Sequence, residues 1–362
     1  MAESALFELP QIHARGGPEQ LGRAQGEQLA PSIRAFVAQR QRAARAYLFE
    51  RGRRDEQAFV ALGAACLAAL RSFDEAAWRE HQALAAAAGV GADELYTCAN
   101  MTDIRDCLLW PAARAEAEGC SMILLPPAAT AARAVIAAQT WDLNPEDLEF
   151  VVAVHRLPAA GPETWSITCA GCPSLIGMNQ HGLSVGTTNL KTRGARVGIP
   201  YLSLLHRALA CRTRVEAGAV FSSAPRAAAH SYWAADGEGA EDWECTAASA
   251  VQRASPPALV RTNHCLVRAH QEQEGEPPSS SSRTRLARLE AAAQAGGHDE
   301  ASLRALFASR QDGVDSINRL PEDAQGTSTN ACIIAQPAQR LLRACRGPAT
   351  RGRWTTLPFE RS

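Results

Sequence analysis

The chain has 362 residues, of which 46% are hydrophobic and 21% are charged, and its formal net charge is −1. These values are typical of a folded globular protein and argue against disorder. A chain with so little net charge has no overall field that attracts nucleic acid or an anionic membrane, so we expect neither as a partner. A small, roughly neutral molecule fits better.

The first third of the chain is rich in Ala, Leu and Arg and predicts helices. Helical periodicity covers residues 18–49 and 55–89, and a third helix is expected from about residue 93 to beyond residue 103. We expect this third to form a helical lid or subdomain. The N-terminus is acidic without a signal-peptide core, and no segment reaches the uninterrupted apolar length of a membrane span. The sequence therefore predicts a cytoplasmic protein.

The character of the sequence changes abruptly at Gly119. Short strands are predicted after it, separated by turns rich in Gly, Pro, Asn and Asp. They cover residues 120–125, 134–140, 150–155, 166–170, 183–187, 229–234, 241–245 and 331–345, with helices near 199–210, 215–222 and 283–294. Gaps of hairpin length favour antiparallel pairing, and the order predicts antiparallel sheets with helices outside them. The polar segment 271–282 is interpreted as a surface loop.

The eleven cysteines have no regular spacing, which predicts reduced thiols that are mostly buried. Cys169 and Cys172 form a CxxC pair. A zinc site would need more ligands, with His181 the nearest candidate, and a redox pair would open a helix. This pair instead ends a strand and precedes Pro173, so we interpret both as structural thiols. The sequence contains no Walker-type loop and no HExxH motif, and we predict no metal and no cofactor.

The pair Gly119-Cys120 suggests an activated nucleophile. A thiol attacks well only as its thiolate, and an N-terminal amine with a pKa of about 7.7–8.0 can take its proton. An internal cysteine gains such an amine only when the preceding peptide bond is cut. We expect Gly119 to allow a strained backbone that exposes its carbonyl to the thiol. A helical segment that ends in Gly-Cys and passes into a strand is typical of such a precursor, although a single Gly-Cys pair is more often an ordinary turn.

Several short segments form an ordered series along the chain. They are residues 17–26 (GPEQLGRAQG), 119–121 (GCS), 139–142 (QTWD), 176–183 (IGMNQHGL), 189–190 (NL), 261–264 (RTNH) and 281–289 (SSRTRLARL). In this order they resemble the acyl-coenzyme A:6-aminopenicillanic-acid acyltransferase family, which is related to the cholylglycine hydrolases and penicillin V acylases. One departure is Thr140, where the family usually has Asn. It puts in doubt a hydrogen bond near the nucleophile.

The resemblance implies a catalytic role for four matching residues. Cys120 would be the nucleophile, both for self-cleavage and for substrate. Asp142 would orient the new α-amino group through a charged hydrogen bond. Asn263 would donate its side-chain amide to the oxyanion of the tetrahedral intermediate. Arg285 would hold the Cys120–Asp142 cluster by charge, with Arg283 as the rival because the register is ambiguous there.

Two further residues, Trp141 and Asn189, are the substrate-binding candidates that the resemblance implies. Each of these candidates also has an ordinary structural interpretation. Cys120 fits a buried strand cysteine, Asp142 and Asn263 fit turn residues, and an isolated arginine is usually a surface group.

The resemblance also implies the fold and the reaction. The fold is α+β, the four-layer αββα sandwich of antiparallel sheets of N-terminal nucleophile (Ntn) hydrolases, with a helical N-terminal segment. Made as a precursor, the chain would cut itself into residues 1–119 and residues 120–362, which stay together as a heterodimer and may assemble further. The mature enzyme would hydrolyse a small non-peptide or N-acyl amide through an acyl-thioester on Cys120.

Three alternatives stay open on the sequence alone. The same thioester would serve an acyltransferase that moves an acyl group from a thioester donor to an amine. An uncleaved member without catalysis would bind a small molecule in the same cleft, and Thr140 is its best support. A protein built on Cys169 and Cys172 would bind zinc or carry out redox chemistry, and its activity would survive loss of Cys120.

Overall fold

The computed structural model describes residues 6–50, 52, 55–109, 119–253, 258–323 and 326–360. The strands are β1 (Gln11–Gly16), β2 (Gly119–Leu125), β3 (Ile136–Leu143), β4 (Val151–Pro158), β5 (Thr164–Cys169), β6 (Ile176–Asn179), β7 (Ser184–Asn189), β8 (His230–Asp236), β9 (Gly239–Cys245), β10 (Ala250–Arg253), β11 (Leu259–Arg261), β12 (Ser328–Gln336), β13 (Leu341–Arg346) and β14 (Thr355–Leu357). The helices are α2 (Pro18–Glu50), α3 (Glu56–Phe73), α4 (Glu75–Ala88), α5 (Ala92–Ala99), α6 (Met101–Leu109), α7 (Tyr201–Leu209), α8 (Arg214–Ser223), α9 (Arg268–Gln271), α10 (Ser280–Ala295) and α11 (Glu300–Phe307). Short 3₁₀ turns are η1 (Pro127–Ala129), η2 (Pro145–Phe150), η3 (Gly313–Asp315) and η4 (Pro337–Gln339).

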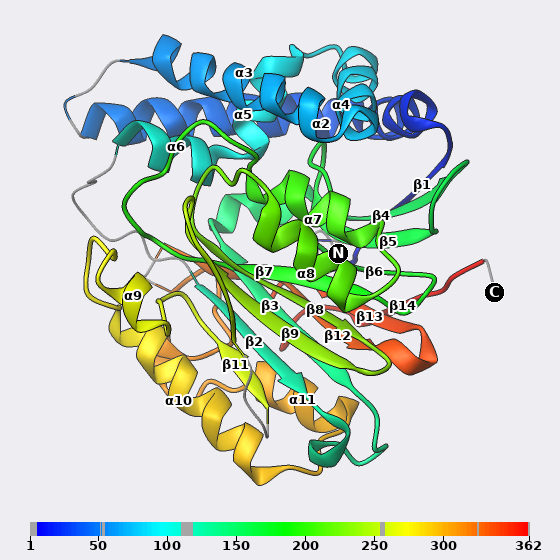
Figure 1. Ribbon diagram of the computed structural model, residues 1–362, viewed down its shortest axis with the longest axis vertical. Coiled ribbons are helices and arrows are strands. Elements are labelled where there is room, and N and C mark those ends of the chain that lie inside the picture. Colours follow the sequence, from blue (N-terminus) through cyan, green and yellow to red (C-terminus); the bar gives the residue numbers. More distant parts are fainter. Residues whose placement is uncertain are drawn as a thin grey trace.

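The strands form two sheets that pack face to face. The eight-stranded sheet has the order β1-β4-β5-β6-β7-β8-β9-β10, and the six-stranded sheet has the order β11-β2-β3-β12-β13-β14. Helices α7 and α8 contact β6 to β10 on one side, while α10 and α11 contact β2, β11 and β12 on the other (Figure 1). This is the α+β, four-layer αββα arrangement that the sequence predicts.

Alternation along β2 directs its side chains into two different cores. Cys120 and Met122 belong to the large core that spans both sheets, whereas Ile123 joins a smaller core under α10 and α11. Ser121 shares the face of Ile123, and its Oγ accepts a hydrogen bond from Arg285 of α10 at 3.1 Å. The thiol of Cys120 therefore faces the inside of the sandwich, while its neighbour faces a helix.

The N-terminal third is mostly helical, as predicted, but it also supplies a strand. β1 pairs in parallel with β4 at the edge of the eight-stranded sheet, and α2 packs against both of these strands. The helix predicted across residues 93–103 is two helices, α5 and α6, which are separated at Asn100. The expected helical lid or subdomain therefore also contributes an edge strand, β1, to the sheet (Figure 1).

One described helix, α3, is long and apolar enough by length and composition to cross a membrane, with a mean hydropathy of 1.2, whereas the sequence alone predicts no such segment. In this fold α3 packs against α4, α5 and α6. Its residues Phe59, Cys66 and Leu70 are buried in a shared apolar cluster. A single helix of this kind is weak evidence for a membrane segment.

The segment predicted as a surface loop, residues 271–282, is shorter than expected. Gln271 ends α9, and α10 begins at Ser280, where the Ser279 hydroxyl caps the helix by accepting a hydrogen bond from the Ser282 N–H at 3.1 Å. Ser281 and Ser282 are buried. The run of serines is therefore a helix start, and it brings α10 up to the strand that carries Cys120.

Candidate active site

Cys120 lies near the start of β2, and its side chain is 6% exposed. A cavity of about 30 Å³ adjoins it, which is enough for one or two water molecules. The cavity is lined by Thr102, Cys120, Trp141, Asp142, Leu143, Leu175, Thr187, Asn189, Tyr201, His230 and Asn263. Five of the residues that the sequence singled out therefore meet around one cavity, although they come from four separate parts of the chain.

Asn263 holds the backbone nitrogen of Cys120. The Cys120 N–H donates to Asn263 Oδ1 at 2.7 Å, and Asn263 Nδ2 donates to the carbonyl of Asn189 at 3.2 Å. The sequence predicts Asn263 as a donor to an oxyanion. In this arrangement its amide NH₂ is engaged by Asn189, and its oxygen marks the position of the nitrogen that self-cleavage would turn into an amine.

Arg285 binds the backbone carbonyl of Cys120. Its Nη1 donates to the Cys120 carbonyl at 2.5 Å, and its Nη2 donates to Asn263 Oδ1 at 3.1 Å. The guanidinium is fully buried, and burial next to Arg319 lowers the pKa of Arg285 to about 10. Arg283, the alternative in the sequence, is exposed on α10. Arg285 is therefore the arginine that contacts Cys120.

The structure gives a steric reason for glycine at position 119, whereas the sequence alone suggests a conformational one. Gly119 lies in extended β2 and is not among the described residues with positive φ, so the strain expected at this residue does not take the form of a left-handed backbone. It pairs directly opposite Asp142 on β3. A Cβ at Gly119 would approach Asp142 Oδ2 to 2.7 Å and the guanidinium of Arg319 to 3.0 Å. The carboxylate and the arginine thus leave no room for a side chain at Gly119, the residue that precedes Cys120.

Asp142 is buried and poorly satisfied. Within the described residues, neither carboxylate oxygen has a well-aligned hydrogen-bond partner, and the nearby hydroxyls of Thr329 and Thr140 act only to reduce its pKa in part. Arg319 Nε lies 3.7 Å from Oδ2. Burial raises the pKa of Asp142, and the charges of Arg319 and Arg285 oppose that shift without cancelling it. Such an unsatisfied carboxylate beside a candidate nucleophile marks a functional site.

Arg319 is a site residue that the sequence reasoning misses. It lies between η3 and β12, where no motif signals it. Its guanidinium donates to the hydroxyls of Ser281 and of Thr327, the latter at 2.5 Å. Because Ser281 also accepts from Arg285 Nε at 3.2 Å, one serine orients both arginines.

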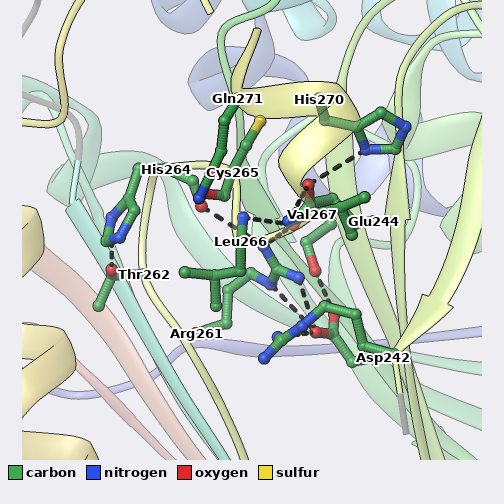
Figure 2. Close-up of polar contacts among 12 residues, drawn as sticks. Asp242, Glu244, Arg261, Thr262, His264, Cys265, Leu266, Val267, His270 and Gln271 are labelled. Carbon is green, nitrogen blue, oxygen red and sulfur yellow. Dashed lines mark hydrogen bonds and ion pairs between the residues drawn. The ribbon is translucent and has the colours of Figure 1, made fainter.

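The segment that carries Asn263 is anchored by a buried ion network (Figure 2). Arg261 donates to Asp242 at 2.8 Å and to Glu244 at 2.6 Å, and all three side chains are 0% exposed. Glu244 also accepts a hydrogen bond from His270 Nδ1 at 3.1 Å, and these contacts lower the pKa of Glu244 to about 2. Arg261 therefore fixes the chain two residues before Asn263.

A second anchor lies directly beside Asn263. Ser282 Oγ accepts from the Asn263 N–H at 3.0 Å and contacts His264 Nδ1 at 2.8 Å. Burial and the neighbouring charge of Arg261 lower the pKa of His264 to about 4, so its imidazole is neutral at neutral pH. His264 acts here as a structural neighbour and not as a base for Cys120.

Another part of the cavity wall that the sequence does not predict is His230 with its partners. His230 Nε2 lies 2.7 Å from Asp103 Oδ1, and its ring stacks on Tyr201 at 4.5 Å. Its Nδ1 is buried and has no hydrogen-bond partner among the described residues. Since a carboxylate accepts hydrogen bonds, Nε2 is the nitrogen of His230 that donates to Asp103.

A cleft of about 900 Å³ lies next to the small cavity. Thr102 and Leu143 line both spaces. The walls come mainly from α2, α3, α6 and the segment 143–149. Apolar groups such as Tyr47, Phe59 and Met101 alternate with charged ones. The size suits a small molecule.

The CxxC cysteines stay outside this site. Cys169 and Cys172 are each 3% exposed, and none of the eleven cysteines, all of which are described, forms a disulfide. Burial raises the pKa of Cys172 to about 12 and that of Cys169 as well. Both are therefore protonated at neutral pH, which disfavours the redox alternative.

One further motif belongs to the core. Residues 182–186 read GLSVG, which matches the Gly-x-Ser-x-Gly pattern of serine hydrolases. Ser184 lies inside the extended strand β7, is fully buried, and donates to the Gly177 carbonyl at 2.9 Å. It is not at a strand-to-helix turn, so it is not a nucleophile elbow.

Comparison with known proteins gives a family match. The family described as acyl-coenzyme A:6-aminopenicillanic acid acyl-transferase matches residues 130–350. The search of curated proteins found no match.

Solved structures give weaker likenesses. An N-acylethanolamine-hydrolyzing acid amidase ortholog of Caenorhabditis elegans has 14% identity and a TM-score of 0.45, covering 66% of this chain and 100% of that one. A mutant conjugated bile acid hydrolase of Clostridium perfringens has 10% identity and a TM-score of 0.45, and the match covers 67% of this chain and 97% of that one. A penicillin V acylase of Agrobacterium tumefaciens has 13% identity and a TM-score of 0.37, and the match covers 62% of this chain and 82% of that one. At these values they bear neither on the residues of the site nor on the substrate.

Proposed function

The chain belongs to the acyl-coenzyme A:6-aminopenicillanic acid acyl-transferase family, and from that premise we propose that it is a self-processing amide hydrolase whose nucleophile is Cys120. Membership makes it an enzyme of the amide hydrolase and acyltransferase class. Its specific reaction, its cleavage at Gly119-Cys120 and its division into residues 1–119 and 120–362 are our proposals.

The observation that carries the proposal is that buried side chains bind both the backbone N–H and the backbone carbonyl of Cys120. Asn263 accepts from its N–H at 2.7 Å, and Arg285 donates to its carbonyl. Few strand residues have both backbone groups bound by buried polar side chains from distant segments. Such contacts fix the nitrogen and the thiol of one residue relative to the cavity, which is what an N-terminal nucleophile requires.

Self-cleavage would proceed in two steps. The Cys120 thiolate attacks the Gly119 carbonyl carbon, the Gly119–Cys120 C–N bond breaks, and the nitrogen takes a proton to become the α-amine. Water then hydrolyses the resulting thioester, leaving a carboxylate on Gly119 and a thiol on Cys120. The crowding of Gly119 by Asp142 and Arg319 supports this reading, because departure of Gly119 would leave that carboxylate beside the new amine.

Turnover of substrate would repeat the same chemistry. The α-amine of Cys120, with a pKa of about 7.7–8.0 when unperturbed, takes the thiol proton as the thiolate attacks the substrate carbonyl. The amine portion of the substrate leaves with a proton, and the acyl group stays on sulfur as a thioester. Asp142 would orient the α-amine, and Asn263 would turn its NH₂ toward the oxyanion, a contribution worth about 3 kcal/mol in other acyl-transfer enzymes. Trp141 and Asn189 would border the acyl group.

Water is our preferred acceptor for the thioester. The 30 Å³ cavity against Cys120 has room for a water molecule but not for a second organic substrate. The runner-up is transfer to an amine, which the adjoining cleft of about 900 Å³ favours because it has room for two reactants.

Intact-mass measurement on the purified chain tests the proposal. We expect two fragments, 1–119 and 120–362, for the wild type and for Cys107→Ala, a matched control at a partly exposed cysteine. We expect one full-length chain for Cys120→Ala. A panel of N-acyl amides then separates hydrolysis from transfer through the products formed with and without added amine. A wild type that stays full-length would remove the α-amine from the mechanism and favour an uncleaved binding protein.

A further inference from the structure

A pair of histidines lies far from Cys120 at the edge strand β1. β1 and β4 pair in parallel with His13 directly opposite His155, and the two Nδ1 atoms are 2.9 Å apart. Glu360, close to the C-terminus, places Oε1 4.0 Å from His155 Nδ1. One ligand atom from each of the three residues lies within 4.8 Å of the other two. The proposed reaction uses none of them.

The orientation of His155 is fixed by its surroundings. Its Nε2 lies 2.6 Å from Oε1 of Glu163, which is 0% exposed. An ionised carboxylate only accepts hydrogen bonds, so Nε2 carries the proton and Nδ1 presents its lone pair. Trp165 stacks on the ring at 4.2 Å with an interplanar angle of 4°. The ring therefore cannot turn without losing both contacts, and its lone pair points toward His13.

We propose that His13, His155 and Glu360 bind a divalent transition-metal ion, with Zn²⁺ as the best fit. Two imidazoles and a carboxylate are a common three-ligand set for Zn²⁺, with a fourth position for water. The arrangement of Glu163, His155 and metal is the carboxylate–histidine–metal relay that orients ligating histidines. Tetrahedral Zn²⁺ separates two nitrogen ligands by about 3.3 Å. The 2.9 Å gap must open by a few tenths of an ångström, which the exposed His13 side chain permits.

The third ligand, Glu360, is held in position by two contacts. Arg15 donates to Glu360 Oε2 at 2.9 Å, which leaves Oε1 directed toward the histidines. The backbone N–H of Glu360 donates to Glu163 Oε1 at 2.7 Å, so the C-terminal segment is held in place before any metal arrives.

A metal here would join three distant segments. His13 comes from β1, His155 from β4 and Glu360 from the end of the chain. If Gly119-Cys120 is cut, which rests on the proposed function, His13 belongs to the small chain and the other two ligands to the large one. The ion would then hold the two chains together at the edge of the sheet.

Calorimetric titration of ZnCl₂ into the EDTA-treated full-length protein tests the site. We expect the wild type to bind one more Zn²⁺ per chain than His13→Ala, and His181→Ala, a matched change at an exposed histidine elsewhere, to behave as wild type. Glu163→Gln should bind about 10- to 100-fold more weakly, as expected for a residue that orients a ligand. Equal stoichiometry and affinity in wild type and His13→Ala would overturn the proposal.

The same titration in Cys120→Ala separates this inference from the proposed function. The uncleaved chain should bind Zn²⁺ with the same stoichiometry, since the ligands do not depend on cleavage. Loss of the site in Cys120→Ala would contradict the geometry described. Unfolding curves of His13→Ala without metal should overlay those of the wild type, because His13 is exposed, and so exclude misfolding as the cause of lost binding.

Discussion

Two buried clusters of arginine and acid in this molecule are built in opposite ways. In one, Arg261 binds Asp242 at 2.8 Å and Glu244 at 2.6 Å. Glu244 also accepts hydrogen bonds from the backbone N–H groups of Leu266 at 2.8 Å and Val267 at 3.0 Å. In the other cluster, Asp142 lies 3.7 Å from Arg319 and has no well-aligned hydrogen bond within the described residues.

The difference separates a scaffold from a reactive site. The saturated cluster lowers the pKa of Glu244 to about 2, which means that the fold stabilises its charge. The unsaturated cluster raises the pKa of Asp142, which means that the fold disfavours its charge. A buried acid that its surroundings leave unsatisfied costs stability, and it persists where a reaction uses it. The first cluster holds Asn263 in place, and we infer that the second takes part in the chemistry.

Asp142→Asn is the sharpest test of this contrast. We expect amide hydrolysis to fall about a thousandfold, within the range for loss of general acid–base catalysis, because the α-amine that takes the thiol proton would lose the group that orients it. Stability should not fall. A raised pKa means that the favourable contribution of neutral Asp142 is complete below about pH 3.9 and is lost as the pH rises through the raised value. Asn stays neutral, so the variant should match or exceed the wild type at pH 7, and the advantage should vanish near pH 3.

Turnover by pre-cleaved protein and urea unfolding between pH 3 and pH 8 measure these two effects. Glu80→Gln is the matched control, because Glu80 is also buried but pairs with Arg156 at 2.8 Å, away from Cys120, and its contacts with Arg156 and His206 lower its pKa to about 2. It should lose stability and keep the chemistry at Cys120. If Asp142→Asn kept full activity, the unsatisfied carboxylate would be a defect of packing. The two clusters would then not differ as scaffold and reactive site.

Glu244→Gln tests the cluster that Glu244 forms with Arg261. A lowered pKa means that the stabilisation is complete above about pH 4.5 and is lost as the pH falls toward about 2. The shift corresponds to about 3 kcal/mol, which we expect the variant to lose at pH 7. Chemical denaturation measures it. Activity per folded molecule should change by less than tenfold, since Glu244 acts through the position of Asn263; a larger loss would move Glu244 into the catalytic machinery.

The sequence predicts the content of the site better than its geometry. Gly-Cys at a helix-to-strand change, together with the ordered segments that carry Asp142, Asn263 and Arg285, is enough to bring four parts of the chain to one place. Arg319 is missed because it lies outside any strand, helix or motif, and its contact with Asp142 depends on how the loop before β12 closes. The role of Gly119 is misread because steric crowding by residues of other segments leaves no trace in the local sequence.

The fold, like the site, has parts that the sequence predicts and parts that it misses. Helices and most strands follow from periodicity, and hairpin-length gaps correctly indicate antiparallel sheets. β1 is missed because it is six residues long and its partner β4 is 142 residues away, as measured between His13 and His155. Parallel pairing over such a distance has no local signal. The histidine pair therefore becomes visible only in three dimensions.

Gly119→Ala separates cleavage from turnover. A methyl group at this position would lie 2.7 Å from Asp142 Oδ2, so the residue must shift and with it the carbonyl that Cys120 attacks. We expect self-cleavage to slow by about 10- to 100-fold, a cost of about 1–3 kcal/mol for crowding in a packed core. The fraction that does mature should turn over substrate at the wild-type rate, since Gly119 is then a chain end. A time course of intact mass, followed by assay of the cleaved fraction, checks both statements, and unchanged cleavage would mean that the crowding plays no part.

Thr140→Val probes the departure from the family pattern and should have the smallest effect. The Thr140 hydroxyl accepts from the Ser121 N–H at 3.2 Å, and Thr140 is fully buried. Valine has the same shape but no acceptor, so a buried N–H is left unpaired at a cost of about 1–3 kcal/mol. The hydroxyl also helps to lower the pKa of Asp142, so its loss should move the low-pH limb of activity upward. Thr140→Asn, the usual family residue, supplies an oxygen acceptor and should retain more stability than Thr140→Val. If both variants lost equal stability, the size of the side chain and not the hydrogen bond would be what this position selects.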